Sequence, residues 1–338
     1  MQSLQHLHTF SLPTSCNDIL TFDSVNSLTK LLESLHKSPY IILGEGSNTV
    51  FTEDYCATVL LNRIKGITIK DDKTHYLINV GAGENWHQLV EHCLRKGIGG
   101  FENLALIPGT VGAAPIQNIG AYGIEIERFI FKVEYLDTFT MTKASFSREE
   151  CAFGYRDSVF KNQKQNERII TSVIFKLPKQ YKLETSYSPL NTLKTPSAFD
   201  IFEQVIRTRN EKLPKVSEFG NAGSFFKNPV VNQHVLENIK SRYPNVPVFK
   251  VEDSGASKHT LFKIPAAWLI DQLGFKGKEL GGIACYKNQP LVLVNLGGGT
   301  GAELLLLARE IRDSVKATFN ITLENEVRLI GKEGLLSL

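Results

Sequence analysis

The stretch that decides how this chain begins to fold is Tyr40–Asn48, which reads YIILGEGSN. Its apolar first half predicts a strand, and its two glycines predict a turn directly after it. Upstream, Ser24 is a suitable N-cap for a helix with helically spaced leucines that ends before Pro39. Downstream, Thr58–Leu61 predicts a second strand. The order of these elements is that of a small β-α-β-like unit.

The turn itself allows two interpretations. It consists of Gly44, Glu45, Gly46, Ser47 and Asn48. The glycines and the small polar residues would let backbone N–H groups approach a phosphate. Clusters of Gly, Ser and Asn also serve simply to reverse the chain. Phosphate binding is therefore one of two alternatives at this point.

A second glycine-rich segment, Pro108–Gly123, follows the strands predicted at 67–70 and 75–80 and the helix predicted at 84–96. It is too broken for a regular element and too apolar for a disordered linker. A tightly packed Ω-like loop is one interpretation. Because a phosphate-type turn already lies at Gly44, the segment favours the binding of a large dinucleotide.

The rest of the chain predicts a mixed α+β fold. Long strands are expected at 131–137 and 168–177, and a helix at 197–212. The apolar positions of that helix are Phe199, Phe202, Val205 and Ile206. A third region, about 214–315, should contain the segment Gly220–Pro229, a helix at 265–273, a strand at 291–296 and a helix at 303–316.

One further motif is Gly297–Ala302, which reads GGGTGA between a predicted strand and a predicted helix. It formally matches the G-x-G-x-x-A fingerprint of dinucleotide-binding turns. An ordinary turn from strand to helix explains the same residues. No Gly-Lys-Ser/Thr follows, so the motif is not a P-loop.

Composition narrows the class of protein. The 338 residues carry a formal net charge of +3, with 42% hydrophobic and 22% charged residues, which indicates a globular chain of two or three domains. The basic residues are spread out, so we expect no nucleic-acid or membrane partner. Five cysteines without a Cys-x-x-Cys pair favour a reducing cytosol. The N-terminus lacks the pattern of a signal peptide, so we expect a soluble cytoplasmic protein.

Five segments together resemble the UDP-N-acetylenolpyruvoylglucosamine reductase (MurB) family in order and spacing. They are Gly44–Asn48, Pro108–Gly123, Gly154–Ser158, Gly220–Pro229 and Glu324–Arg328. Thr185–Leu190 resembles the tyrosine-bearing loop of the family's type I members. Two features depart from the family: Asn325 stands where Pro is usual, and the stretch Gly297–Leu307 is longer than expected.

The resemblance implies an α+β fold with an FAD-binding part of the vanillyl-alcohol-oxidase (PCMH) type. This part would have two subdomains, 1–65 with 317–338 returning to it, and 66–213. An α+β substrate-binding domain would occupy 214–316. The resemblance also implies non-covalent FAD, NADPH as co-substrate, a nucleotide-sugar substrate and a monomer.

The implied FAD contacts are the two glycine-rich segments. In the resemblance they comprise Gly44, Glu45, Gly46, Ser47, Asn48, Pro108, Gly109, Thr110, Gly112, Ala113, Gln117, Asn118, Gly120, Ala121, Tyr122 and Gly123. The fingerprint match at Gly297 loses its support, because FAD in this fold does not use a Rossmann turn.

The implied catalytic residues are Arg156, Ser224 and Glu326. A guanidinium can bind a substrate carboxylate bidentately and stabilise charge that develops on it. A positioned hydroxyl can give a proton to a strongly basic carbon, and a carboxylate can support it. Each also has a structural alternative: Arg156 could pair with Asp157, Ser224 could cap a turn, and Glu326 could be a surface carboxylate.

The family positions that contact the UDP-sugar diphosphate region match Tyr187, Lys212 and Asn228. Two other functions remain open at this stage. One is an FAD oxidase of the same fold, although the two glycine-rich loops offer no His or Cys to tether FAD. The other is a non-catalytic flavin-binding or nucleotide-sugar-binding protein.

Overall fold

The computed structural model describes residues 1–36, 38–161, 167–251 and 260–338, which form two compact units. The first unit contains 1–2, 16–45 and 56–211, and the second contains 3–15, 46–55 and 212–338. Residues 252–259, within the third region expected from the sequence, lie outside the described part. The division into three domains stays a prediction.

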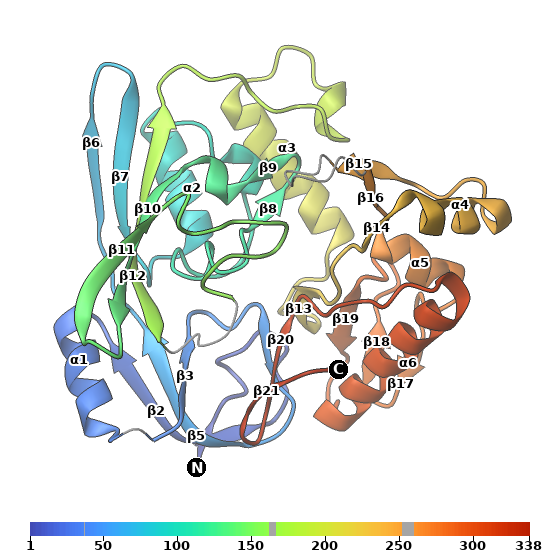
Figure 1. The fold of residues 1–338 in the computed structure, drawn as a ribbon, viewed down its shortest axis with the longest axis horizontal. Coiled ribbons are helices and arrows are strands. Elements are labelled where there is room, and N and C mark those ends of the chain that lie inside the picture. Colours follow the sequence, from blue (N-terminus) through green and yellow to red (C-terminus); the bar gives the residue numbers. More distant parts are fainter. Residues whose placement is uncertain (37, 162–166, 252–259) are drawn as a thin grey trace. The chain divides into compact units, whose positions relative to one another are not determined.

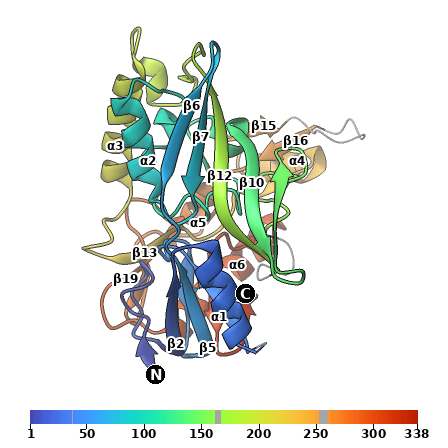
Figure 2. The same ribbon diagram turned by 90° about the vertical axis from the view of Figure 1, so that its left-hand side faces the viewer.

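The main sheet of the first unit has the order β11-β10-β12-β7-β6 and is antiparallel throughout. Its strands are β6 (Ile67–Asp71), β7 (His75–Gly81), β10 (Ile130–Asp137), β11 (Thr142–Ser147) and β12 (Arg168–Pro178). Helices α2 (Trp86–Arg95) and α3 (Ala198–Lys212) lie on one face of this sheet (Figures 1 and 2). The predicted strands and helices of this region are confirmed.

A second sheet, of order β1-β2-β5-β3, holds the opening stretch. Its strands are β1 (Gln2–Ser3), β2 (Ser15–Phe22), β3 (Tyr40–Leu43) and β5 (Tyr55–Asn62). Strands β3 and β5 pair in parallel, and α1 (Val25–Ser34) starts at an N-cap on Ser24. The two predicted strands and the helix are thus confirmed, whereas β2 was not predicted from the sequence.

The core of the first unit is aromatic beneath the main sheet. Trp86 contacts Phe101 at 5.1 Å between ring centroids, and Phe101 contacts Phe175 at 5.2 Å. Helix α3 buries Ile201 and leaves Phe199 57% exposed. The hydroxyl of Ser197 and the carboxylate of Asp200 bond at the start of α3, and Phe199 stacks on Phe202 from outside.

Within its described residues, the second unit combines three small sheets with three helices. The sheets have the orders β13-β19-β18-β17, β14-β16-β15 and β21-β20-β4. The elements are β4 (Thr49–Phe51), β13 (Gly220–Ser224), β14 (Val230–Val231), α4 (Gln233–Arg242), β15 (Phe249–Val251), β16 (Leu261–Lys263), α5 (Ala266–Gln272), β17 (Glu279–Leu280), β18 (Ile283–Cys285), β19 (Val292–Asn295), α6 (Gly301–Phe319), β20 (Arg328–Gly331) and β21 (Gly334–Leu336).

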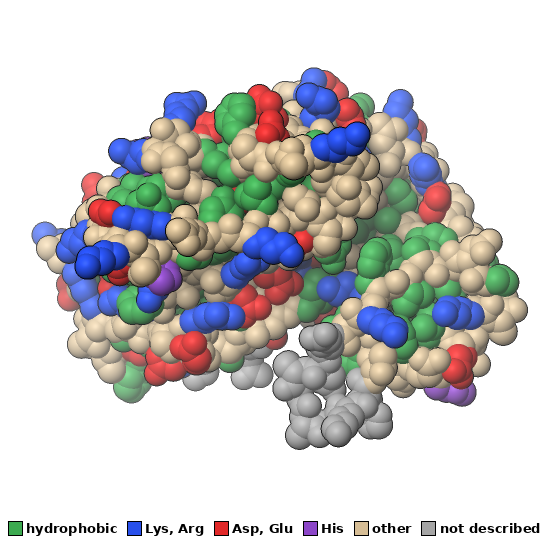
Figure 3. All heavy atoms as spheres, turned by 90° about the horizontal axis from the view of Figure 1, so that it is seen from above, with side chains coloured by type: hydrophobic (Ala, Val, Ile, Leu, Met, Phe, Trp, Pro, Cys, Tyr) green, Lys and Arg blue, Asp and Glu red, His purple; other side chains and the backbone are tan. Residues whose placement is uncertain are grey.

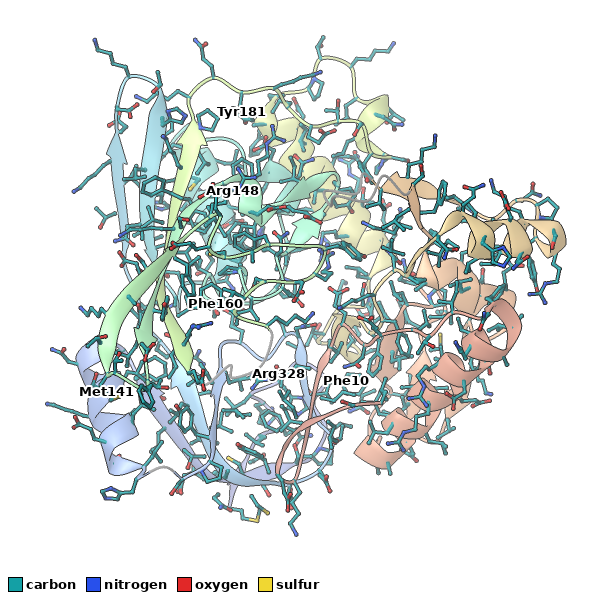
Figure 4. All side chains as sticks on the ribbon, in the orientation of Figure 1. Phe10, Met141, Arg148, Phe160, Tyr181 and Arg328 are labelled. Atoms are coloured by element: carbon teal, nitrogen blue, oxygen red, sulfur yellow. The ribbon has the colours of Figure 1, made fainter. Side chains whose placement is uncertain are left out.

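Two long-range connections organise this second unit. Strand β20 pairs in parallel with β4, so the end of the chain lies beside residues 49–51. The segment around Phe10, labelled in Figure 4, packs against β13 and β19: Asn295 Nδ2 donates to the Phe10 carbonyl at 3.2 Å. Both connections bring parts of the expected site segments together within one unit.

The surface shows no single-sign character on the face in Figure 3. Among the described residues on that face, Lys and Arg side chains alternate with Asp and Glu. None of the helices in the described ranges is long and apolar enough to span a membrane.

Candidate active site

In the first unit, Glu45 joins the two glycine-rich segments. Its carboxylate accepts hydrogen bonds from Asn85 Nδ2 at 2.8 Å and from the Gly109 N–H at 3.1 Å. Gly44 lies equally close to the second segment, because a Cβ built there would be 2.6 Å from Thr110 Oγ1. The expected FAD residues Gly44, Glu45, Gly109 and Thr110 are therefore brought together. The Glu45 carboxylate, however, binds protein groups in this arrangement.

The first half of the second segment uses its backbone N–H groups mostly within the protein. Gly112 donates to the Ala82 carbonyl at 2.9 Å, and Ala113 donates to the Thr110 carbonyl at 3.0 Å. A Cβ on Gly112 would be 2.6 Å from that of Ala82, so this glycine allows close packing. The N–H of Thr110 donates to no residue in the described ranges. Thr110 is thus a residue of this half with a free backbone donor, while Pro108 contributes none.

The second half of the segment is a two-stranded hairpin. Strands β8 (Gly120–Ala121) and β9 (Ile124–Glu125) are joined by Tyr122 and Gly123, with φ of 47° and 86°. Positive φ at both turn residues is the geometry of tight hairpins, and it favours glycine. The hairpin exposes Gly123 and leaves Gln117, Gly120 and Tyr122 half-buried.

Asn118 is fully buried under this hairpin. Its Nδ2 donates to Glu125 Oε2 at 2.9 Å and to the Gly154 carbonyl at 3.1 Å, and its Oδ1 accepts from the Glu127 N–H. A side chain with three such bonds holds the loop in place. The expected role of Asn118 as a direct FAD contact stays a prediction.

Arg156 is carried by a tight turn that docks on the same loop. Gly154 and Asp157 exchange two backbone hydrogen bonds, and Arg156 takes φ of 55° between them. Its guanidinium donates to the Gly120 carbonyl at 2.9 Å. The buried Ser158 hydroxyl donates to the Ile116 carbonyl at 2.7 Å. The structure thus brings Arg156 to the predicted FAD loop within this unit.

A second arginine, Arg209 on α3, was missed by sequence analysis. Its Nε is buried and has no hydrogen-bond partner in the described part of the chain. Burial lowers the pKa of Arg209, the charge of Tyr122 opposes this shift, and the charge of Arg156 adds to it. A lone arginine in an amphipathic helix gives no sequence signal, so only the structure identifies this cationic neighbour of Arg156.

Tyr187 belongs to the loop named in the resemblance and is 47% exposed. Its ring lies against Gly123: a Cβ on Gly123 would be 2.9 Å from Tyr187 Cδ2. The predicted substrate residue is therefore next to the predicted FAD loop in the first unit.

In the second unit, the remaining turn residues Gly46, Ser47 and Asn48 face the N-terminal segment and β20. A Cβ on Gly46 would be 2.0 Å from the Leu7 carbonyl oxygen, and φ of Gly46 is 66°. Asn48 Nδ2 donates to the Glu326 carbonyl at 3.2 Å. The N–H groups of Gly46 and Ser47 donate to no described residue, so they are available to an anion.

Arg328 also lies beside this turn and was not singled out from the sequence. Its N–H donates to the Asn48 carbonyl at 2.9 Å, and its side chain is labelled in Figure 4. Burial lowers its pKa to about 10, opposed by the charge of Tyr55, so the guanidinium stays charged at neutral pH. The only signal in the sequence is its position two residues after Glu326.

The segments of Ser224 and Glu326 lie side by side. Phe226 pairs with Asn325 in an antiparallel bridge, and the Glu326 N–H donates to the Phe225 carbonyl at 2.8 Å. The ion pair of Lys227 and Glu324, at 2.9 Å, closes the far end of this contact. The half-buried hydroxyl of Ser224 has no hydrogen-bond partner in the described ranges. It is therefore not the turn-capping serine of the structural alternative.

The two other predicted substrate residues have different surroundings. Asn228 Oδ1 accepts from the Ala266 N–H at 2.9 Å at the start of α5, which fixes the side chain and leaves its N–H donors for a ligand. Lys212 is the exposed last residue of α3. The structure alone does not separate Lys212 from an ordinary solvated helix end.

The Gly297–Ala302 motif has a structural explanation. Thr300 and Glu303 form a capping box at the start of α6, and Asn295 Oδ1 accepts from the N–H groups of Gly297 and Gly299. A Cβ on Gly301 would be 1.7 Å from the Thr52 carbonyl oxygen. Gly299 and Gly301 allow close packing, Gly297 and Gly298 take positive φ in the turn, and the Glu303 carboxylate accepts from the Thr300 N–H at the helix terminus.

Comparisons with known proteins define first the class and then the family. Residues 19–139 match the family model "FAD binding domain". A solvent-stable cholesterol oxidase shares the fold with a TM-score of 0.51 at 11% identity, covering 96% of this chain and 86% of the oxidase. The fold is thus that of an FAD-binding flavoprotein of the PCMH-type, as the sequence predicted.

The remaining matches are more specific. Residues 215–330 match "UDP-N-acetylenolpyruvoylglucosamine reductase, C-terminal domain". The reductase of Pseudoalteromonas atlantica is 48% identical over 100% of this chain and 96% of its own length. That of Yersinia pestis is 46% identical over 98% and 96%. A solved MurB structure from Thermus caldophilus shows the same fold, with a TM-score of 0.65, 24% identity and 97% coverage of both chains. The chain belongs to the UDP-N-acetylenolpyruvoylglucosamine reductase family.

Proposed function

We propose that this chain reduces UDP-N-acetylglucosamine enolpyruvate to UDP-N-acetylmuramate, with NADPH as reductant and FAD as cofactor, in peptidoglycan precursor synthesis. The observation that carries this function is the 48% identity to a named reductase over the whole chain. We also propose that it acts in the cytoplasm as a monomer, without nucleic-acid or membrane partners.

The glycine-rich residues fit FAD. In the second unit, the undonated N–H groups of Gly46 and Ser47 suit a pyrophosphate, and the charged Arg328 lies beside the same turn. In the first unit, the Thr110 N–H is free, and Gly120 and Gly123 of the hairpin carry no side chain. When bound, FAD would carry the hydride from NADPH to the enolpyruvyl β-carbon.

Arg156 would bind the substrate carboxylate. Its positive φ and its bond to the Gly120 carbonyl hold the guanidinium against the predicted flavin loop. A guanidinium stays charged at any working pH and can pair bidentately with a carboxylate. Its charge would stabilise the negative charge that develops on the substrate carboxylate as the β-carbon is reduced.

Ser224 would donate its hydroxyl proton to the α-carbon, and Glu326 would support that transfer. The Ser224 hydroxyl has no hydrogen-bond partner in the described ranges, so no protein acceptor there competes for its proton. Glu326 belongs to the segment that pairs with residues 225–227. Tyr187, Lys212 and Asn228 would bind the diphosphate region of the substrate.

The test separates the two halves of the reaction. Ser224→Ala should leave reduction of the bound flavin by NADPH nearly intact and slow its reoxidation by the nucleotide sugar by roughly a thousandfold. Stopped-flow absorbance follows both steps, with Ser241→Ala on the exposed face of α4 as the control. An unchanged reoxidation rate would remove Ser224 from catalysis. NADPH consumption that does not depend on the sugar would instead favour an oxidase.

A further inference from the structure

The loop that carries Tyr187 is held by hydrogen bonds to a three-residue 3-10 helix, Glu102–Leu104, in the same unit. The Tyr181 hydroxyl donates to the buried Glu102 at 3.0 Å (Tyr181 is labelled in Figure 4). Asn103, 1% exposed, donates from Nδ2 to the Glu184 carbonyl at 2.9 Å. Two successive residues of this short helix therefore hold the segment that leads to Tyr187.

The same Asn103 amide also holds the predicted flavin loop. Its Nδ2 donates a second hydrogen bond, of 2.9 Å, to the Tyr122 carbonyl in the hairpin turn. An amide nitrogen has two N–H donors, and both are used here. One buried side chain thus fixes the distance between the turn at Tyr122 and the backbone at Glu184.

Gly123 provides a further contact between the hairpin and the segment that carries Tyr187. A Cβ at this position would be 2.9 Å from Tyr187 Cδ2 and 3.0 Å from Glu184 Cγ. Any side chain would therefore push the tyrosine away from the hairpin. On the other side of Tyr187, its carbonyl accepts from the Asn191 N–H at 3.2 Å, and the fully buried Leu190 anchors the chain. The backbone of Tyr187 is thus anchored on its C-terminal side, and its ring lies against Gly123.

We propose that Asn103 and Gly123 are positioning residues that hold Tyr187 against the flavin loop for binding of the nucleotide sugar. The proposal rests on the function proposed above, because it uses Tyr187 as a substrate contact. It adds two residues that touch no substrate themselves. Their effect should appear in the KM for the sugar.

The decisive variant is Gly123→Ala. It should raise the KM for UDP-N-acetylglucosamine enolpyruvate about tenfold or more, as expected from the loss of one hydrogen bond to a charged group. For Asn103→Asp, at a residue outside both predicted binding loops, the rate of flavin reduction by NADPH should stay within about twofold of the wild-type rate. The KM of NADPH should also be unaffected.

A matched control separates displacement of Tyr187 from backbone strain. Gly97 has φ of 73°, close to the 86° of Gly123, but no atom lies within 4 Å of a Cβ built there. Gly97→Ala therefore introduces similar strain without moving a neighbour, and both KM values should stay at wild-type level. Equal kinetics of Gly123→Ala and Gly97→Ala would overturn the proposal.

A double-mutant cycle tests whether the effect passes through Tyr187. In a Tyr187→Ala background, Gly123→Ala should cause no further rise in the sugar KM. A further rise of the same size would overturn the proposal. Asn103→Asp keeps the size of the side chain, removes both donors and should reproduce the Gly123→Ala phenotype; a wild-type KM would count against it.

Hydrogen exchange keeps the proposal testable apart from the assigned function. Amides 184–190 should exchange faster in Gly123→Ala than in Gly97→Ala, and unchanged protection would overturn the anchoring. If Tyr187→Ala leaves the sugar KM unchanged, the role of Tyr187 in the proposed function is wrong, and so is the catalytic consequence of the anchoring. The exchange result would still decide whether Asn103 and Gly123 hold the loop.

Discussion

Replacement of Glu45 by alanine should weaken FAD binding, although the structure gives this residue no direct role in contacting a ligand. The carboxylate accepts hydrogen bonds from Asn85 Nδ2 and from the Gly109 N–H, at 2.8 and 3.1 Å. It therefore holds the entry to the second glycine-rich segment against the first. Without the carboxylate, the Gly109 end of that segment would lose its fixed conformation in the FAD-free protein. FAD binding would then have to order it.

The size of the effect follows from these two bonds. Hydrogen bonds to a charged group contribute about 1.5 to 3 kcal/mol each, and the lower value suits a half-buried residue. Loss of both should cost about 3 kcal/mol, or roughly a hundredfold in the dissociation constant of FAD. Glu45→Gln keeps one neutral acceptor and should lose about half of that free energy, or roughly tenfold.

The backbone hydrogen bonds that connect residues 109–111 to residues 84–86 should remain in the variant. The Trp86 N–H donates to the Gly109 carbonyl at 2.9 Å, and the Val111 N–H donates to the Glu84 carbonyl at 2.8 Å. These bonds do not involve Glu45. The loss should therefore appear mainly in FAD affinity, and only weakly in the unfolding of the FAD-free protein.

The assay is titration of FAD-free protein, followed by quenching of flavin fluorescence. Glu91→Ala is the control, because Glu91 is a carboxylate of the same unit whose ion pair with Arg95 is long, at 3.7 Å, and exposed. FAD affinity of Glu45→Ala that is equal to or tighter than that of the wild type would refute the reasoning. Tighter binding would mean that the carboxylate repels the bound pyrophosphate.

Two further predictions concern the second unit. Burial lowers the pKa of His8 from 6.5 to about 4, so between these pH values the unfolded chain binds a proton that the folded chain does not. About 3 kcal/mol of stability should therefore be lost as pH falls from 6.5 to 4, with no further loss below. In denaturant titrations, the free energy of unfolding should depend less steeply on pH for His8→Asn. Gly301→Ala should destabilise the protein by more than about 3 kcal/mol in the same titrations, because its Cβ would meet the Thr52 carbonyl. Gly298→Ala, which has open space at its Cβ, should cost only about 1 kcal/mol and leave the KM for NADPH unchanged. A loss of NADPH affinity in Gly298→Ala would restore the dinucleotide interpretation of that motif.

The local sequence predicted those elements whose signals are local. Apolar runs predicted β3 and β7, and the N-cap at Ser24 marked the start of α1. Strand β2 was missed because its buried positions do not alternate, since its pattern is set by partners on either side. The exposure of Phe199 could not be predicted from the sequence either, because tertiary packing decides which residues near the start of α3 are covered.

The chemistry of the site was less predictable than its location. The motifs predicted which loops matter, and the structure shows that Arg156, Asn118 and the hairpin at Tyr122 meet within one unit. The role of Glu45 depends on Gly109, 64 positions away. The environment of Arg209 depends on the loops of Tyr122 and Arg156, which are distant from α3 in the sequence. Such roles come from tertiary contacts, which a local pattern does not encode.

Glycine illustrates why motif matching is ambiguous and how the ambiguity is removed. Gly46, Gly112 and Gly301 all allow a close approach of backbone or side chain that a Cβ would block. Their N–H groups decide the interpretation. Gly112 donates to Ala82, and the N–H groups of Gly297, Gly299 and Thr300 donate to Asn295 and Glu303, so these donors are already used by the protein. Gly46 and Ser47 keep theirs. An undonated N–H beside a glycine in the described structure, rather than the glycine itself, is what indicates an anion site.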